Sequence, residues 1–235
     1  MQQAVGVDLG GSHVMAAVVG DNGDISSRHQ RELDDLSVEA VFKAIEETIA
    51  QALSQTKAKS IAGIGLGSPG NIDPDSGTIL YSPNFQWKNV PLGERLRKRF
   101  DIPVFVGNDA RCATLGEFTY GVGRGTLHFV LLTLGTGIGG GIISGGNLLL
   151  GNSAGAGEFG HHQIRPKSGF VCSCGKIGCF EAQASGTGLI RHACALAASF
   201  PRSLLLSKDP QKLGSKAIRK AAQNGDPHAL AAWRN

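Results

Sequence analysis

The chain has 235 residues, of which 41% are hydrophobic and 18% are charged, and its formal net charge is +4. This composition predicts a soluble globular protein with room for one large domain or two small ones. The densest basic cluster shares a predicted helix with Leu92 and Leu96, which favours a solvated helix face over a nucleic-acid-binding patch. No apolar stretch of the sequence is long enough to cross a bilayer, so a membrane partner is not expected.

The first half of the chain alternates between short apolar runs and turns. The runs at 4–9, 14–19 and 25–30 predict an antiparallel meander of three strands. From residue 37 to about 56 the apolar side chains recur at helical spacing, which predicts an amphipathic helix. A buried strand is expected at 61–66.

The second half is expected to begin with an irregular stretch at 84–91, a short basic helix and a strand at 104–106. Further along we expect a helix from 108 to 120, apolar strands at 129–134 and 138–143, and helices at 188–200, at 211–223 and from 227 onward. A shift in composition near Asp109 predicts two lobes, 1–108 and 109–235.

One histidine and three cysteines lie within nineteen residues, which is the ligand set of a closed tetrahedral zinc site. The cysteines are Cys172, Cys174 and Cys179, and the glycines among them permit the tight turns that such a site needs. Spacing alone leaves both His161 and His162 open as the nitrogen ligand. Cys-x-Cys is a poor disulfide pair and no secretory signal is recognisable, so a reducing cytoplasm is expected.

Two glycine-rich segments carry a hydroxyl after an apolar run. In residues 8–12, a carboxylate precedes two glycines and a serine, so this segment predicts either a plain hairpin turn or a site for magnesium and phosphate. Residues 134–141 contain Gly-x-Gly-x-x-Gly, but a dinucleotide-binding fold needs a helix next, whereas an apolar strand pattern follows. We therefore expect a second hairpin. Together the two segments predict a nucleotide whose phosphates are held by both lobes.

Several other polar residues have a structural and a functional interpretation. Asp109 either caps the helix that follows it or accepts a proton from an attacking alcohol, and the local sequence does not decide between them. The remaining candidates lie in irregular or glycine-rich surroundings and are of the types that grip sugar hydroxyls: Asn84, Glu158, His161 and Glu181.

Taken together, these motifs resemble the ROK family, which comprises sugar kinases, amino-sugar kinases and sugar-responsive repressors. The resemblance extends from Val5 to about Ser185. It is carried, in chain order, by residues 8–12, 65–70, 83–87, 108–109, 134–141, 157–161 and 172–181.

The resemblance implies an α/β fold of the actin-like, two-lobed hexokinase type (ribonuclease H-like), with a sugar in the cleft. It implies ATP-dependent phosphorylation of a hexose at the 6-hydroxyl, with Asp109 as the base, and residues 83–92 favour glucose. The sugar would be bound by Asn84, Asn108, Asp109, Glu158, His161 and Glu181. The phosphates and Mg²⁺ would face Asp8, Gly10, Gly11, Ser12, Thr136 and Gly137. A structural zinc ion would be held by His161, Cys172, Cys174 and Cys179, and a homodimer is possible.

The sequence departs from the family pattern in three places. Ser12 replaces the commoner threonine but keeps the hydroxyl, and His13 stands where many members carry lysine or asparagine. The glycine-rich segment that holds adenosine in the family has no counterpart before Asn235, so we expect a truncated C-terminal part.

Alternatives are a kinase of N-acetylglucosamine or N-acetylmannosamine and an inactive sugar-binding fragment. A repressor would need a helix-turn-helix ahead of Asp8, and seven residues leave no room for one. The phosphate donor is either ATP or polyphosphate.

Overall fold

The protein is described by a computed structural model that covers residues 2–235 except 57–59, 153, 204 and 206–212. The chain forms two compact units. The first comprises Met1–Leu131 and Gly141–Gly157, and the second comprises Leu132–Gly140 and Glu158–Asn235. The predicted division into lobes after residue 108 stays a prediction.

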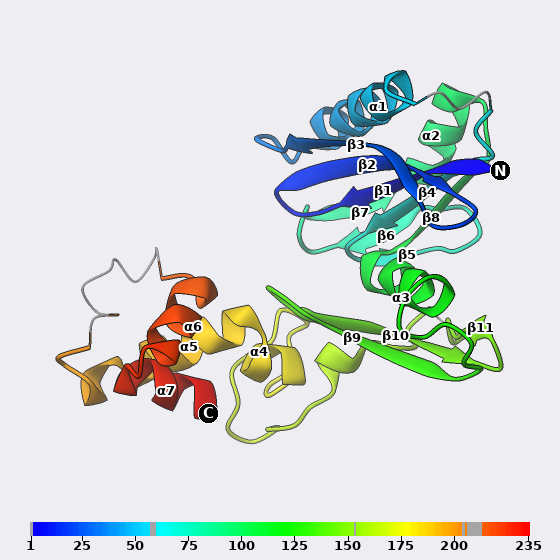
Figure 1. Cartoon of the computed structure of the whole chain (residues 1–235). Coiled ribbons are helices and arrows are strands. Elements are labelled where there is room, and N and C mark those ends of the chain that lie inside the picture. The colour runs from blue at the N-terminus through cyan, green and yellow to red at the C-terminus, as the bar shows by residue number, and fades with distance from the viewer. Residues whose placement is uncertain (1, 57–59, 153, 204, 206–212) are drawn as a thin grey trace. The chain divides into compact units, whose positions relative to one another are not determined.

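The first unit is built on a five-stranded sheet with the order β3-β2-β1-β4-β8 (Figure 1). Its strands are β1 (Gln3–Leu9), β2 (His13–Gly20), β3 (Ile25–Glu32), β4 (Ile64–Ser68) and β8 (Val104–Asn108). The first three pair antiparallel, so the predicted meander is confirmed. β4 runs parallel to β1, and β8 runs parallel to β4.

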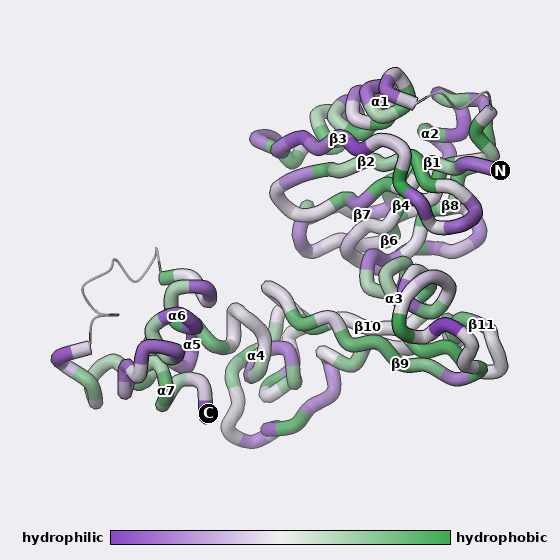
Figure 2. Tube along the Cα trace, viewed as in Figure 1, coloured by the Kyte–Doolittle hydropathy of each residue, from purple (hydrophilic) through white to green (hydrophobic). Residues whose placement is uncertain are grey.

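Helices cover both faces of this sheet. α1 (Val38–Ser54) and α2 (Leu92–Phe100) lie on one face, and α3 (Asp109–Thr119) lies on the other. α1 begins after Ser37, whose hydroxyl accepts the backbone N–H of Ala40. Its apolar stripe is buried in the core of the unit, and Figure 2 shows hydrophobic and hydrophilic residues alternating along the helix.

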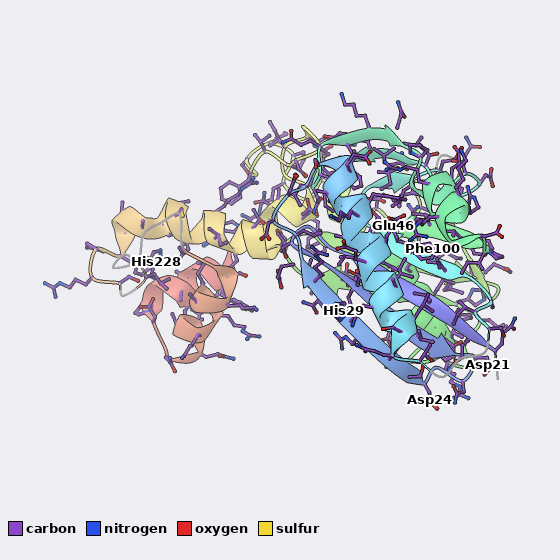
Figure 3. All side chains as sticks on the ribbon, turned by 90° about the horizontal axis from the view of Figure 1, so that it is seen from above. Asp21, Asp24, His29, Glu46, Phe100 and His228 are labelled. Atoms are coloured by element: carbon purple, nitrogen blue, oxygen red, sulfur yellow. The ribbon has the colours of Figure 1, made fainter. Side chains whose placement is uncertain are left out.

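Two of the basic residues of α2 pair with acidic residues of α1. Arg95 forms an ion pair with Glu39 at 2.6 Å, and Arg99 does so with Glu46 at 3.0 Å. The Arg95 guanidinium also lies 4.0 Å from the centre of the Phe42 ring. Figure 3 shows Glu46 on α1 and Phe100 at the end of α2. These contacts support the interpretation of the basic cluster as a helix face.

A small antiparallel sheet corrects one prediction. Its strands are β5 (Asn71–Ile72), β6 (Ile79–Ser82) and β7 (Trp87–Val90), so part of the stretch expected to be irregular is a strand paired with β6. Gln86 and Asn89 have positive φ angles of 56° and 52°, which interrupts the regular alternation that would have indicated a strand. The Trp87 indole N–H donates to the Leu36 carbonyl at 3.0 Å and fixes this sheet to the loop before α1.

The third sheet contains the second glycine-rich segment. Its strands are β9 (Phe129–Leu134), β10 (Ile138–Ser144) and β11 (Asn147–Leu148), in the order β11-β10-β9. Residues 135–137 join two neighbouring strands, and β10 takes the place of the helix that a dinucleotide-binding fold requires. The predicted hairpin is therefore confirmed.

The remainder of the second unit is mostly helical. Its elements are η1 (Phe159–His161), α4 (Phe180–Ala184), α5 (Gly186–Leu196), η2 (Ala197–Ser199), α6 (Ser215–Gln223) and α7 (Pro227–Arg234). α5 starts and ends earlier than expected, α4 was not expected, and residues 211 and 212 of the expected 211–223 helix lie outside the described residues. Nε2–H of His228, labelled in Figure 3, donates to the Ala193 carbonyl at 2.7 Å and ties α7 to α5.

Among the described residues, none of the helices combines the length and the apolar character that spanning a membrane requires.

The buried face of α1 generates a stability prediction. Ile45 is fully buried in the core of the first unit, so Ile45→Ala should lower the free energy of unfolding by about 2–5 kcal/mol through lost burial and a residual cavity. The control is Ile25→Ala, because this side chain is 61% exposed and should change stability by less than about 0.5 kcal/mol. Urea denaturation followed by circular dichroism measures both. Equal losses for the two variants would contradict the packing of α1.

Candidate functional site

The ends of three parallel strands bring polar residues to one edge of the large sheet. The register pairs Asp8 of β1 with Gly67 of β4, and Ser68 of β4 with Asn108 of β8. Ligands of open parallel sheets bind beyond the carboxyl ends of the strands. The structure therefore gathers three of the predicted segments at this edge: Asp8 with its glycine turn, the loop after Ser68, and Asn108 with Asp109.

Asn108, and not Asp109, caps α3. The Asn108 side-chain oxygen accepts the backbone N–H of Arg111 at 3.2 Å, and its amide nitrogen donates to the Gly70 carbonyl at 3.3 Å. Asp109 is the first residue of the helix, and one of its oxygens accepts the N–H of Ala110 at 2.8 Å. The structural interpretation of Asp109 as the cap is thus not needed, and its carboxylate stands at the start of α3 beside the strand end.

The electrostatic surroundings of Asp109 suit a base. Burial raises the pKa of Asp109 above its ordinary value, and the negative charge of Asp8 raises it further. A carboxylate with a raised pKa accepts a proton more readily at neutral pH. Cys112 lies one helical turn further along α3. Its burial, and to a smaller extent the negative charge of Asp109, raise the pKa of the Cys112 thiol to about 11, which keeps the thiol protonated and a poor nucleophile.

The first glycine turn lies next to Asn84. The backbone N–H of Gly10 donates to the His13 carbonyl at 2.9 Å and closes the turn, while Gly11 and Ser12 are exposed. A Cβ on Gly11 would lie 3.6 Å from the Asn84 amide nitrogen. One predicted sugar residue and one predicted phosphate turn are therefore neighbours in the first unit.

The second glycine turn, residues 135–138, forms hydrogen bonds with residues of α4 and α5. The Glu181 carboxylate accepts the backbone N–H of Ile138 at 2.9 Å. The Gly135 carbonyl accepts the N–H of Gly186 at 2.9 Å, and the Thr187 hydroxyl donates to the Thr136 carbonyl at 2.9 Å. Thr136 itself remains exposed.

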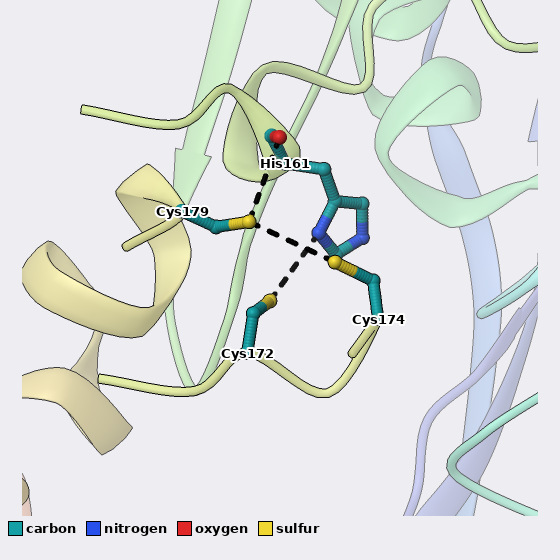
Figure 4. A group of neighbouring side chains, drawn as sticks. All are labelled: His161, Cys172, Cys174 and Cys179. Carbon is teal, nitrogen blue, oxygen red and sulfur yellow. Dashed lines mark hydrogen bonds between the residues drawn. The ribbon is translucent and has the colours of Figure 1, made fainter. Parts of the chain in front are cut away.

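One imidazole and three thiols form a compact cluster in the second unit (Figure 4). The ligand atoms of His161, Cys172, Cys174 and Cys179 all lie within 4.8 Å of one another. Nδ1 of His161 is 3.5 Å from Sγ of Cys172, and Sγ of Cys174 is 3.7 Å from Sγ of Cys179. Tetrahedral bonds of about 2.3 Å to sulfur separate the ligands by roughly 3.7 Å. These side chains therefore fit a metal ion of tetrahedral preference.

The structure distinguishes the two neighbouring histidines. His161 ends the short turn η1 and its ring belongs to the cluster, whereas His162 is exposed and is not part of it. The Glu158 carbonyl accepts the N–H of His161 at 3.1 Å, so Glu158 stands on the same turn.

The predicted sugar residues are divided equally between the units. Asn84, Asn108 and Asp109 belong to the first, and Glu158, His161 and Glu181 belong to the second.

Sequence reasoning missed two contacts that support these residues. The buried Arg111 guanidinium donates to the Ala154 carbonyl, and the Ser173 hydroxyl lies 3.4 Å from the Glu181 carboxylate. The first joins residues 43 positions apart, and no sequence signal could have indicated it. The positive φ of Ala154, 50°, is not encoded by a glycine either.

The comparisons with known proteins agree with these motifs. Residues 4–235 match the ROK family. The chain belongs to the ROK family. It is 41% identical over 230 residues to the glucokinase of Thermotoga maritima, and the alignment covers 96% of this chain and 71% of that protein. A xylose repressor from Caldicellulosiruptor bescii is 35% identical over 191 residues, and the alignment covers 79% of this chain and 47% of that protein.

The fold agrees with solved ROK structures. A ROK family glucokinase from Streptomyces griseus, in complex with glucose and AMPPNP, superposes with a TM-score of 0.84 at 36% identity and covers 99% of this chain and 74% of that one. A ROK hexokinase from Thermus thermophilus superposes with a TM-score of 0.80 at 32% identity, covering 98% of this chain and 72% of that one. The predicted actin-like, hexokinase-type fold class is confirmed.

The cysteine cluster of this ROK chain generates a metal-binding prediction. The purified protein should contain about one metal ion, and Cys172→Ser should weaken metal binding by more than about 100-fold because a buried thiolate ligand is lost. Cys194→Ser is the matched control, since Cys194 is exposed and outside the cluster. Elemental analysis and competition with a chelator measure the effect. Full metal content in Cys172→Ser would contradict the ligand set.

Proposed function

We propose that this ROK chain is an ATP-dependent hexose kinase that converts glucose to glucose 6-phosphate. The observation that carries the proposal is Asp109, a carboxylate of raised pKa at the end of β8 beside Asn108 and Asp8. Its surroundings suit the abstraction of a proton from an alcohol. Similarity to glucokinases over nearly the whole chain supports glucose as the alcohol.

In the proposed reaction, Asp109 accepts the proton of the sugar 6-hydroxyl. The sugar oxygen forms a bond to the terminal phosphorus of ATP, the bond to the bridging oxygen breaks, and ADP leaves. Phosphoryl transfer of this kind depends on positioning and on stabilisation of charge rather than on a covalent intermediate. The Asn108 cap holds the start of α3, and thereby Asp109, in place.

Each of the two glycine turns is proposed as a phosphate-binding element for MgATP. In the first unit, Asp8 would face the magnesium ion of this substrate, and Gly10, Gly11 and Ser12 would offer N–H groups and a hydroxyl. In the second unit, Thr136 and Gly137 would likewise offer a hydroxyl and backbone N–H groups to the phosphates. The Asp8 carboxylate is exposed at the end of β1 and is accessible to a hydrated cation.

The residues that we propose for sugar binding are Asn84, Asn108, Asp109, Glu158, His161 and Glu181. Nδ1 of His161 faces Cys172, so Nε2 is the ring atom that could donate to a sugar hydroxyl. A ligating histidine commonly uses its second nitrogen in this way.

Zinc is the metal that we propose for the cluster, because three thiolates and one imidazole are its preferred structural ligands. When bound, zinc would supply a fixed crosslink between η1 and the segment 172–179. All five cysteines lie in the described part of the chain and none of them forms a disulfide, which supports a reducing, cytoplasmic location.

Two alternatives use the same residues. The preferred sugar could be N-acetylglucosamine or N-acetylmannosamine, and comparing kcat/KM for these sugars and for glucose decides between them. A catalytically inactive sugar-binding ROK protein would bind glucose in calorimetry and release no ADP with any of these sugars.

Asp109→Asn should lower kcat by about 10²–10⁴-fold, because the amide cannot accept the proton from the sugar. A coupled assay of ADP release in the presence of glucose measures the loss. Cys112→Ala is the control, since this thiol lies one turn further along α3 and has no proposed role. Retained turnover in Asp109→Asn would exclude Asp109 as the base.

The raised pKa of Asp109 also predicts how stability depends on pH. A carboxyl whose pKa is higher in the folded than in the unfolded state favours folding at low pH, and this contribution is lost as the pH rises through the folded-state pKa. Asp109→Asn removes the titration. The variant should therefore gain stability relative to wild type as the pH rises above the ordinary carboxyl pKa of about 4. Denaturation at several pH values measures this gain, and a relative loss over the same range would contradict the raised pKa.

A further inference from the structure

We propose that Glu181 is a positioning residue that couples the metal segment, residues 172–179, to the second glycine turn, residues 135–138. Metal binding would thereby shape the turn proposed to contact phosphate. The significance for catalysis rests on the proposed function, whereas the coupling itself does not.

The Glu181 carboxylate joins the two segments directly. One of its oxygens accepts the Ile138 N–H at 2.9 Å, and the other lies 3.4 Å from the hydroxyl of Ser173. Ser173 stands between two of the cluster cysteines. A hydrogen bond from a backbone N–H to a carboxylate is roughly twice as strong as a neutral one. One side chain therefore connects the turn to a residue whose position the metal would fix.

Glycines make this close approach possible. A Cβ on Gly137 would collide with the Glu181 carboxylate, and a Cβ on Gly160 would collide with the Ile138 carbonyl. Gly160 belongs to η1, which ends at the cluster residue His161. The turn is thus seated against both segments that carry metal ligands.

The helices after the cluster add a second connection. Cys179 is the N-cap residue of α4, which carries Glu181, and α5 begins directly afterwards. The first residues of α5, Gly186 and Thr187, donate to the carbonyls of the turn. Fixing Cys179 on a metal would therefore fix the start of α4 and, through it, both sets of contacts.

The division of the chain supports the coupling. Residues 132–140 belong to the second unit, together with the metal segment, although β9 and β10 extend into the first. Because linkage is reciprocal, a metal that orders the turn should raise affinity for MgATP, and MgATP should raise affinity for the metal by the same factor.

The test measures amide hydrogen exchange of the whole chain by mass spectrometry, first loaded with Zn²⁺ and then treated with a chelator. We expect chelation to speed exchange in residues 172–179 and also, by about tenfold or more, at the Ile138 N–H. Zn²⁺ added back should restore both. Faster exchange in 172–179 with an unchanged turn would overturn the proposal.

Three variants with Zn²⁺ bound locate the connection. Glu181→Ala should speed exchange at Ile138 by about tenfold or more, and Ser173→Ala by about two- to tenfold. The matched control is Gln163→Ala, because the Gln163 amide donates to the Ile177 carbonyl at 2.9 Å within the metal segment but does not reach the turn. If Glu181→Ala changes the turn no more than Gln163→Ala does, the proposal is wrong. Should Glu181→Ala not fold, the chelation experiment on the unaltered chain decides alone.

Calorimetry of MgATP binding is the second readout. Chelation and Ser173→Ala should weaken binding, whereas Gln163→Ala should leave it unchanged. Neither hydrogen exchange nor binding requires turnover, so a chain that phosphorylates no sugar would refute the proposed function without refuting the coupling. Altered exchange with unaltered MgATP affinity would refute the role of the turn in phosphate binding and leave the coupling intact.

Discussion

The parallel alignment of β1, β4 and β8 determines where the chemistry of the first unit stands. These strands are apolar runs inside the core, so a charged side chain can be accommodated only where each strand leaves the sheet. The register brings those exits to the same edge, and Asp8 and Asp109 become electrostatic neighbours. The raised pKa of Asp109 is therefore a consequence of the register as well as of local burial.

Features encoded by local patterns were predictable from the sequence. The meander follows from alternating apolar residues, α1 from its helical periodicity, and the metal cluster from cysteines whose spacing places them in one tight loop. The Gly-x-Gly-x-x-Gly segment was interpreted as a hairpin because the residues after it continue a strand pattern. In each case the decisive residues lie within a few positions of one another along the chain.

Features that depend on tertiary packing were not predictable. β7 was missed because Gln86 and Asn89 adopt positive φ angles, and α4 because five residues are too short to display a helical period. His161 and His162 are chemically identical neighbours, and only the turn η1 orients one of them toward the cysteines. The Glu181–Ile138 bond joins residues 43 positions apart, and nothing near either residue indicates the other.

The position of Glu181 affects how its substitutions should be interpreted. An ionised carboxylate has about four acceptor sites, so bonds from Ile138 and Ser173 still leave room for sugar hydroxyls. Removing the side chain would then disturb sugar contact and the glycine turn together, and a loss of kcat/KM could not be assigned to either. Ser173 has no proposed sugar contact and touches only one end of this network. The difference between the two substitutions therefore separates the effect on the turn from the effect on the sugar.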